Sequence, residues 1–208
     1  MSDPQKELYN SLMNIITSLS FYSPLIILTS VFMFSMFTGT IGKFSWYMLW
    51  FFVITCLRWL IYKPLINENI PQICNTFIPR DYTYSTYILT FTAMYFIMPM
   101  IMISSQSKSN AMNYGIIALF IAYILIDLFI KKSLSCITGF FSSLVLTNIL
   151  SGVFFGSVIS LGMYSSTLKK YLYINEINSN REFCSMPSKQ TFRCNVFRDG
   201  TLVSSSIN

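Results

Sequence analysis

The segment LVLTNILSGVFFGSVISLGMY, residues 144–164, decides the fold of this chain. It carries no charged side chain, and its length suits a helix that crosses a bilayer, which takes about 20 residues. Gly152, Gly156 and Ser160 follow one another at intervals of four residues. That spacing predicts one smooth helix face for close packing. The partner is either another helix of this chain, which is the simpler prediction, or a second copy in a homo-oligomer.

The composition places the whole chain in the membrane class. Of its 208 residues, 53% are hydrophobic and only 11% are charged, against about 25% charged in an ordinary soluble domain. A soluble domain of this size needs a charged exterior, and this chain has too few charges to supply one. We therefore expect an all-α integral membrane protein in contact with the lipid bilayer.

Further uncharged runs give the number of helices. Residues 1–164 are predicted to form a bundle of about five transmembrane helices, with four or six left open. The expected spans are residues 19–37, 44–62, 86–104, 114–130 and 144–164. Residues 133–143 form either an interfacial connection or the start of a long fifth helix. Pro99, inside the third span, is tolerated if a neighbouring helix covers the carbonyl it leaves unbonded.

The segments outside the spans divide into turns, a loop and a helix start. Pro4, after Ser2 and Asp3, predicts a helix N-terminus that begins either an interfacial helix or a ragged first span. Gly39 and Gly42 predict a tight turn between the first two spans. Three prolines in residues 63–85 predict an extended loop.

Residues 165–208 form a basic extramembrane tail. Phe192, Cys194 and Val196 alternate with polar residues before Asp199-Gly200, a pattern that predicts a β-hairpin. Cys184 and Cys194 are separated by nine residues. A disulfide between them and two free thiols are equally compatible with the sequence.

The net charge of +6 belongs largely to this tail, because six of the 14 basic residues follow Tyr164. Lysines and arginines near the spans divide almost evenly between the two sides, so the positive-inside rule does not choose an orientation. The basic residues are scattered rather than clustered, which argues against a nucleic-acid partner. Charge-assisted contacts to an acidic protein partner are predicted for four tail residues: Arg181, Lys189, Arg193 and Arg198.

Two charged residues lie within or near the ends of spans, Arg58 and Asp127. Such residues are functional candidates by default. However, Arg58 can extend its side chain to the interface, and Asp127 is spaced for a helical ion pair with Lys131. Structural roles at the helix ends are favoured for both. A pairing between them would instead point to a proton or ion pathway.

The chain contains no histidine, which removes the commonest general base and metal ligand. No phosphate-binding glycine loop follows a strand, and no Ser/His/Asp or Cys/His set exists. We expect no enzyme activity, no cofactor and no metal.

The layout of hydrophobic spans followed by the tail FCSMPSKQTFRCNVFRDG, residues 183–200, resembles small multi-pass membrane proteins of nucleocytoplasmic large DNA viruses. The Ile-, Asn-, Tyr- and Ser-rich composition is similar to theirs. The resemblance implies a virion inner membrane location and contacts to minor capsid proteins.

The sequence thus favours a structural protein that anchors a membrane-associated assembly, with capsid or coat proteins as partners under the viral resemblance. The alternatives are a small ion or solute transporter or channel, and an accessory subunit of a membrane enzyme complex. Asn148 is the only strongly polar side chain near the middle of an expected span, which argues against the transporter.

Overall fold

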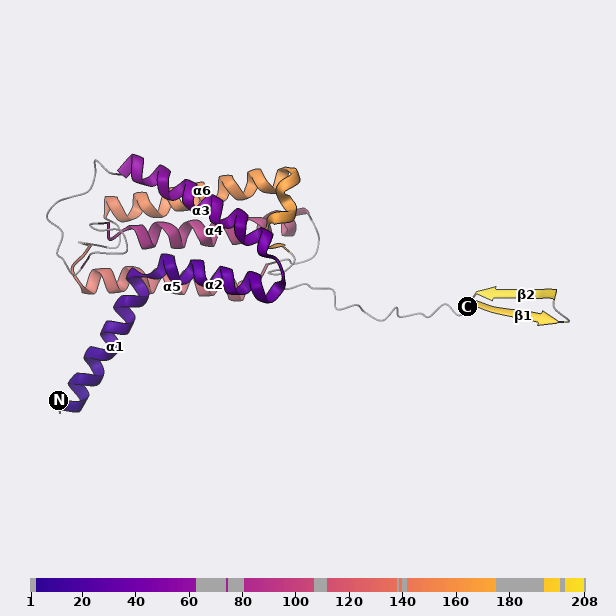
Figure 1. Ribbon diagram of the computed structural model, residues 1–208, viewed down its shortest axis with the longest axis horizontal. Helices are drawn as coiled ribbons and strands as arrows, with labels where there is room; N and C mark the ends of the chain where they lie inside the picture. Colours follow the sequence, from indigo (N-terminus) through magenta and orange to yellow (C-terminus); the bar gives the residue numbers. More distant parts are fainter. Residues whose placement is uncertain are drawn as a thin grey trace.

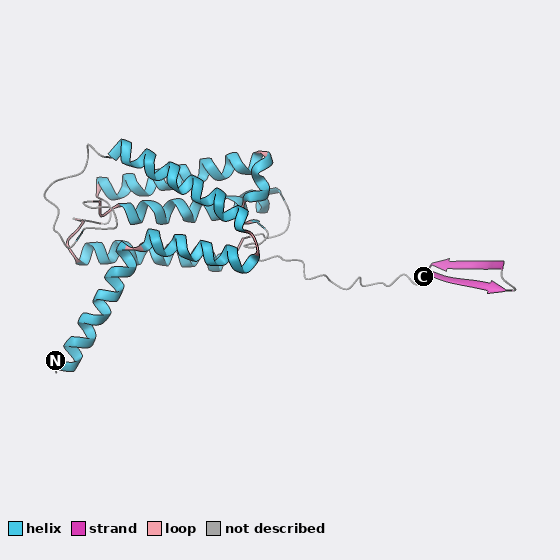
Figure 2. Cartoon of the chain, viewed as in Figure 1, coloured by secondary structure: helices cyan, strands magenta, loops and turns pink. Residues whose placement is uncertain are grey.

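The computed structural model describes residues 3–62, 74, 81–106, 112–137, 139, 142–174, 193–198 and 201–207. Within these residues the chain forms a bundle of long helices and a two-stranded hairpin (Figures 1 and 2). The helices are α1 (Asp3–Phe21), α2 (Ser23–Thr38), α3 (Ile41–Tyr62), α4 (Tyr84–Gln106), α5 (Tyr114–Ser133) and α6 (Ser143–Ser165), followed by the short 3-10 helix η3 (Thr167–Tyr171).

Four of these helices, α3 to α6, are each long and apolar enough to cross a membrane. The predicted helical membrane bundle therefore agrees with the structure at this level. α1 and α2 form a bent pair that adds a fifth crossing if the two are counted as one span. By length and composition the number of crossings is thus four or five.

The first predicted span, residues 19–37, is broken at Tyr22. The axes of the helices before and after this residue differ in direction by 74°. Pro24 lies in the first turn of α2, where its missing N–H removes no helical hydrogen bond. α1 points away from the bundle (Figure 1), with Leu12 and Ile15 exposed. The observed arrangement is a separate N-terminal helix and not a ragged start to the span.

The turn between α2 and α3 is shorter than predicted. Gly39 adopts a left-handed conformation, with φ of 67°, and its N–H bonds to the Met36 carbonyl. The N–H of Thr40 bonds to the Ser35 carbonyl at 2.9 Å, so the last turn of α2 is closed by backbone donors. Gly42 lies inside α3 and not in the turn.

α4 occupies the centre of the bundle and is the most buried of the four candidate spans. Its aromatic residues Tyr87, Phe91 and Tyr95 are almost completely inaccessible to solvent. From α3, the Tyr47 hydroxyl lies 2.9 Å from the Thr92 hydroxyl on α4. Burial of such large rings is a principal source of packing energy in the core.

The small-residue face of α6 packs against α4 of the same chain. A Cβ atom added at Gly152 would lie 2.7 Å from the Tyr87 carbonyl oxygen, and one at Gly156 would lie 2.6 Å from the Phe91 carbonyl oxygen. Both distances are far below van der Waals contact with backbone atoms. The two glycines therefore allow the helix backbones to approach closely.

Ser160, the third residue of that face, covers the break that proline makes in α4. Pro99 has no N–H to donate to the carbonyl of Tyr95, four residues before it. The Ser160 hydroxyl donates a hydrogen bond of 2.9 Å to this Tyr95 oxygen. The expectation that a neighbouring helix covers the freed carbonyl is met by this residue.

The helical body extends beyond the predicted boundary at Tyr164. After η3, Leu172 and Tyr173 are buried in the main core. The Tyr173 hydroxyl lies 2.6 Å from the Ser35 hydroxyl on α2. Residues 165–173 thus belong to the bundle and not to the tail, because their apolar side chains close its end.

The connection between α5 and α6 is not part of a long fifth helix. α5 ends at Ser133, Ser135 has a φ of 59°, and α6 begins at Ser143. Of the loop over residues 63–85, Cys74 and residues 81–83 lie within the described residues, and α4 already begins at Tyr84. The three prolines of that loop lie outside them.

Two strands follow in the tail, β1 (Arg193–Arg198) and β2 (Thr201–Ile207). They pair antiparallel, with Arg198 opposite Thr201 and an irregularity between Val196 and Phe197. The predicted turn residues Asp199 and Gly200 lie outside the described residues.

Candidate functional site

A buried polar layer lies at the end of the bundle where α4 begins. α3 and α5 end at this level, while α4 and α6 start there. This antiparallel arrangement brings side chains from five helices and one turn together. Nine polar and charged residues of the layer are buried: Ser20, Arg58, Asp81, Thr83, Ser85, Thr86, Asp127, Lys131 and Asn148.

Arg58 of α3 is the centre of the first cluster. Its guanidinium forms a two-pronged contact with the Asp81 carboxylate, in which Nη1 binds Oδ2 and Nη2 binds Oδ1. Nη2 also donates to the Thr83 hydroxyl at 3.0 Å. Nε and Nη2 donate to Asn148 Oδ1 at 3.1 and 2.9 Å. The planar fork of arginine suits this bidentate recognition.

Aromatic rings complete the environment of Arg58. The guanidinium carbon lies 5.4 Å from the ring centroid of Tyr84 and 5.2 Å from that of Tyr87. Both distances are within cation–π range. Only 4% of Arg58 is exposed, so the cation exchanges water for a carboxylate, an amide and two ring faces.

The second cluster is built around the ion pair of Asp127 and Lys131 on α5. Lys131 Nζ lies 2.6 Å from Asp127 Oδ2, and both side chains are completely buried. Nζ also donates to the hydroxyls of Ser85 and Thr86 at the start of α4, at 2.5 and 2.6 Å. The three ammonium protons of Lys131 therefore each have an acceptor.

The carboxylate of Asp127 is satisfied in the same way. Its Oδ1 accepts from Ser20 of α1 at 2.6 Å and from Ser85 at 3.0 Å. Its Oδ2 accepts from Thr86 at 2.7 Å, in addition to Lys131. Ser85 and Thr86 each accept from the ammonium and donate to the carboxylate, so the cluster is a closed network. Closure of this kind offsets the cost of burying two charges.

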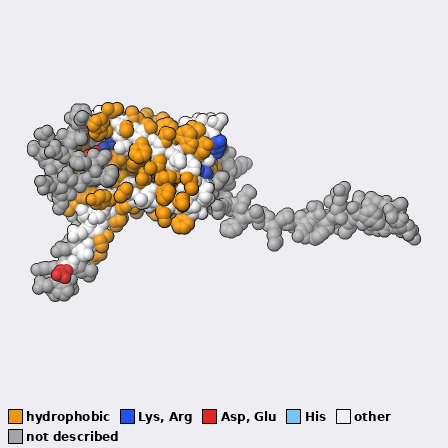
Figure 3. Space-filling model, in the orientation of Figure 1, with side chains coloured by type: hydrophobic (Ala, Val, Ile, Leu, Met, Phe, Trp, Pro, Cys, Tyr) orange, Lys and Arg blue, Asp and Glu red, His pale blue; other side chains and the backbone are white. Residues whose placement is uncertain are grey.

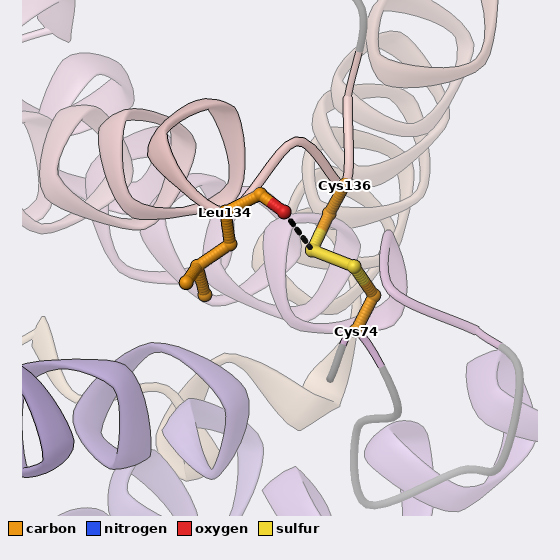
Figure 4. Close-up of a disulfide and its surroundings, with 3 residues drawn as sticks. All are labelled: Cys74, Leu134 and Cys136. Carbon is orange, nitrogen blue, oxygen red and sulfur yellow. Dashed lines mark hydrogen bonds between the residues drawn. A yellow bond between two sulfur atoms is a disulfide. The ribbon is translucent and has the colours of Figure 1, made fainter. Parts of the chain in front are cut away.

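A disulfide between Cys74 and Cys136 lies beside this layer (Figure 4). It joins the loop before α4 to the loop after α5 across a sequence separation of 62 residues. The Leu134 carbonyl oxygen approaches Cys136 Sγ at 3.9 Å. An oxidised sulfur carries no proton, so this contact is not a hydrogen bond. The bridge fixes two loops on the same face of the bundle.

The structure gives each predicted membrane charge its own partner. Arg58 is buried at the end of the bundle, where its side chain binds Asp81 and Asn148. Asp127 pairs with Lys131, as the four-residue spacing predicted. The two predicted residues belong to separate clusters and do not pair with each other. Asn148 lies in the second turn of α6 and not at its middle.

The predicted tail residues are described in part. Arg193, Cys194 and Arg198 belong to β1. Cys184, Arg181 and Lys189 lie outside the described residues, so the predicted bridge between Cys184 and Cys194 and the partner contacts of the tail stay predictions.

Sequence reasoning missed Asp81, the hydroxyls of α4 and the observed disulfide. A usable signal existed for the disulfide. With five spans, the loops containing Cys74 and Cys136 lie on the same side of the membrane. A signal also existed for Asp81, because a buried arginine needs a carboxylate partner and Asp81 stands next to a span.

Among the described residues, no group of three or more His, Cys, Asp or Glu side chains is arranged to hold a metal ion. Comparisons of the chain with protein-family models, curated proteins and solved structures found no match.

Proposed function

We propose that this chain is a structural multi-pass membrane protein that anchors a membrane-associated assembly. The observation that carries the proposal is the closed bonding of Asp127 and Lys131. Both charges are completely buried, and their protons and lone pairs are used within the bundle. A residue that moves an ion or a proton must exchange partners during its work, whereas these groups hold three helices together, α1, α4 and α5.

The cavity beside these helices supports the same role. A space of about 850 Å³ lies between α1, α2 and α5, and its walls are almost entirely apolar side chains such as Leu19, Ile26 and Phe129. Apolar walls suit lipid chains better than a path for ions.

In the proposed arrangement α3 to α6 are four membrane crossings, and the bent pair of α1 and α2 is the fifth, with the start of α1 in the interface and its exposed apolar residues in the lipid. The tail then extends on the side opposite the disulfide. Following the viral resemblance, the membrane is the inner membrane of a virion and the partners are capsid or coat proteins. Arg181, Lys189, Arg193 and Arg198 are the proposed contacts.

Cross-linking of the native assembly tests this function. After mild detergent extraction, lysine-reactive cross-links from Lys169, Lys170 or Lys189 to a coat protein are expected. The R193E/R198E variant should detach from the assembly, because it reverses the charges facing an acidic partner, whereas the control K132E should remain attached. Attachment that survives deletion of residues 175–208 would exclude anchoring through the tail.

A proton-coupled transporter is the second candidate, because buried pairs of a carboxylate and an ammonium are also found in proton relays. Purified protein in liposomes containing a pH-sensitive dye distinguishes the two. Proton flux that is lost in the D127N variant would favour transport. Absence of flux in wild-type vesicles leaves the structural role.

A further inference from the structure

Three lysines gather at the end of the bundle away from the disulfide. Lys43 lies in the first turn of α3, and Lys169 and Lys170 lie in η3, directly after α6. η3 packs against α3, where the ring of Tyr171 lies 5.3 Å from that of Trp46. Lysine and arginine side chains are visible at the end of the bundle where α6 ends, and hydrophobic side chains cover its middle (Figure 3).

Each of these lysines is positioned by a tyrosine ring. The distance from Nζ to the ring centroid is 4.1 Å for Lys169 over Tyr164 and 5.1 Å for Lys170 over Tyr171. Lys43 lies 5.9 Å from the centroid of Tyr173. Lysine together with tyrosine and tryptophan is the combination typical of the headgroup level of a membrane. We call Lys43, Lys169 and Lys170 the lysine collar.

The two ends of the described bundle differ in their acidic residues and in the exposure of their lysines. The acidic residues within the described segments, Asp3, Glu7, Asp81 and Asp127, all belong to α1 or to the disulfide end. At that end Arg58 and Lys131 are buried in ion pairs, so their charge is compensated inside the protein, while Lys132 is exposed. At the collar end Lys169 and Lys170 are exposed. Outside α1, the exposed lysines among the described bundle residues are thus two at the collar end, Lys169 and Lys170, and one at the disulfide end, Lys132.

We propose that the lysine collar binds the headgroups of anionic phospholipids. The inference rests on the membrane-spanning arrangement proposed above. The collar follows the ends of two crossings directly, at the depth where phosphate and carboxylate groups of lipids lie. Each lysine near an anionic surface contributes about a fivefold preference, equivalent to about 1 kcal/mol.

The position of the disulfide supports placing the lysine collar in the cytoplasmic leaflet. Anionic lipids are concentrated in the cytoplasmic leaflet, and disulfides form and persist in oxidising compartments on the other side. The collar and the Cys74–Cys136 bridge lie at opposite ends of the bundle, as these two conditions demand.

Tryptophan quenching by brominated lipids tests the proposal with the full-length chain in lipid nanodiscs. In the W50F/W59F variant, Trp46 reports on the collar end because its ring contacts Tyr171. In the W46F/W50F variant, Trp59, which is 52% exposed, reports on the other end. Brominated phosphatidylserine is compared with brominated phosphatidylcholine in each variant.

Trp46 should be quenched by brominated phosphatidylserine in preference to brominated phosphatidylcholine, by about fivefold or more. Trp59 should show no such preference. K43Q/K169Q/K170Q should abolish the preference at Trp46, and the control K132Q should retain it. A normal Cys74–Cys136 bridge on a non-reducing gel verifies that the triple variant has folded.

Equal quenching by the two lipids at Trp46 would overturn the proposal, and so would a preference that persists in the triple variant. The outcome does not depend on tail contacts, so a negative result leaves the anchoring function standing. Sidedness gives a second test: a fluorescent-protein fusion at Asn208 that matures only in a reducing compartment should be bright. The leaflet assignment would be overturned if this fusion is dark while a separate fusion at Asn208, to a reporter that is active only in the periplasm or the lumen, is active.

Discussion

Asn148 on α6 accepts two hydrogen bonds from the guanidinium of Arg58 on α3, across 90 residues of sequence. Its own amide nitrogen donates to the Leu144 carbonyl at 2.7 Å, which fixes the orientation of the accepting oxygen. Asn148 therefore connects α6, the last long helix of the described bundle, to a buried charge on α3. The relationship makes Arg58 a fixed part of the bundle.

A double-mutant cycle measures this link. R58M and N148L should each destabilise the protein, and their coupling energy should be about 1.5–3 kcal/mol, the range for hydrogen bonds to a charged group. Unfolding in mixed detergent micelles provides the free energies. Additive effects would show that the two residues act independently.

Neighbouring lysines at the end of α5 offer a matched comparison. K131M leaves the buried Asp127 carboxylate without its cation, so a loss of about 3–5 kcal/mol is expected. K132M changes an exposed residue and should stay within about 0.5 kcal/mol of wild type. Thermal unfolding in detergent compares them. Equal effects would contradict the assignment of Lys131 to a closed network.

The hydrogen bond from Ser160 to the Tyr95 carbonyl predicts a suppressor. S160A leaves a buried carbonyl unsatisfied and should cost about 1–3 kcal/mol. P99A restores an N–H that can bond the same carbonyl within α4. The double variant S160A/P99A should therefore recover much of the loss, as measured by unfolding free energy. A double variant as unstable as S160A would refute this account of the proline.

Two glycines of α6 differ sharply in their surroundings. G152A forces a methyl group against Thr90 and the Tyr87 carbonyl, so a loss of about 1–3 kcal/mol is expected from overpacking. At Gly162 nothing lies within 4 Å of an added Cβ, and G162A should be neutral or stabilising by up to about 1 kcal/mol. Melting temperatures of the two variants provide the comparison. The opposite order would exclude the observed contact between α4 and α6.

The disulfide predicts a redox-dependent stability. C74S/C136S should lower the unfolding free energy by up to about 4 kcal/mol for a loop of this length. A reductant should lower the melting temperature of the wild type but not that of the double variant. C56S removes an exposed free thiol and should respond to the reductant as the wild type does. Thermal unfolding with and without reductant measures the change in melting temperature for the wild type and both variants.

The helical elements were predictable because their signal is local. Uncharged runs and aromatic ends of spans identify α3 to α6 within a few residues, and the interval from Gly152 to Ser160 predicted a packing face. The break at Tyr22 was not predictable, because no charged residue marks it in the sequence and contacts of Ser20 and Leu19 with α5, distant in sequence, accompany the bend.

The polar layer was predictable only in part, since most of its contacts join residues far apart in sequence. The pair of Asp127 and Lys131 has a local spacing and was found. Asp81 and Asn148 reach Arg58 across 23 and 90 residues, and no periodicity reports such a contact. The disulfide likewise depends on which loops share a face, which follows from the number of crossings and not from either cysteine's neighbours.

The different origins of the two ion pairs have a consequence for biosynthesis. Lys131 and its counter-ion are in one helix, so α5 can leave the insertion machinery with its charges already compensated. α3 has no such internal partner for Arg58. Asp81 follows only with the next loop, and Asn148 only with the last crossing. The charge of Arg58 therefore gains its counter-ion only after α3 has been made, and its remaining acceptor only when α6 has been synthesised.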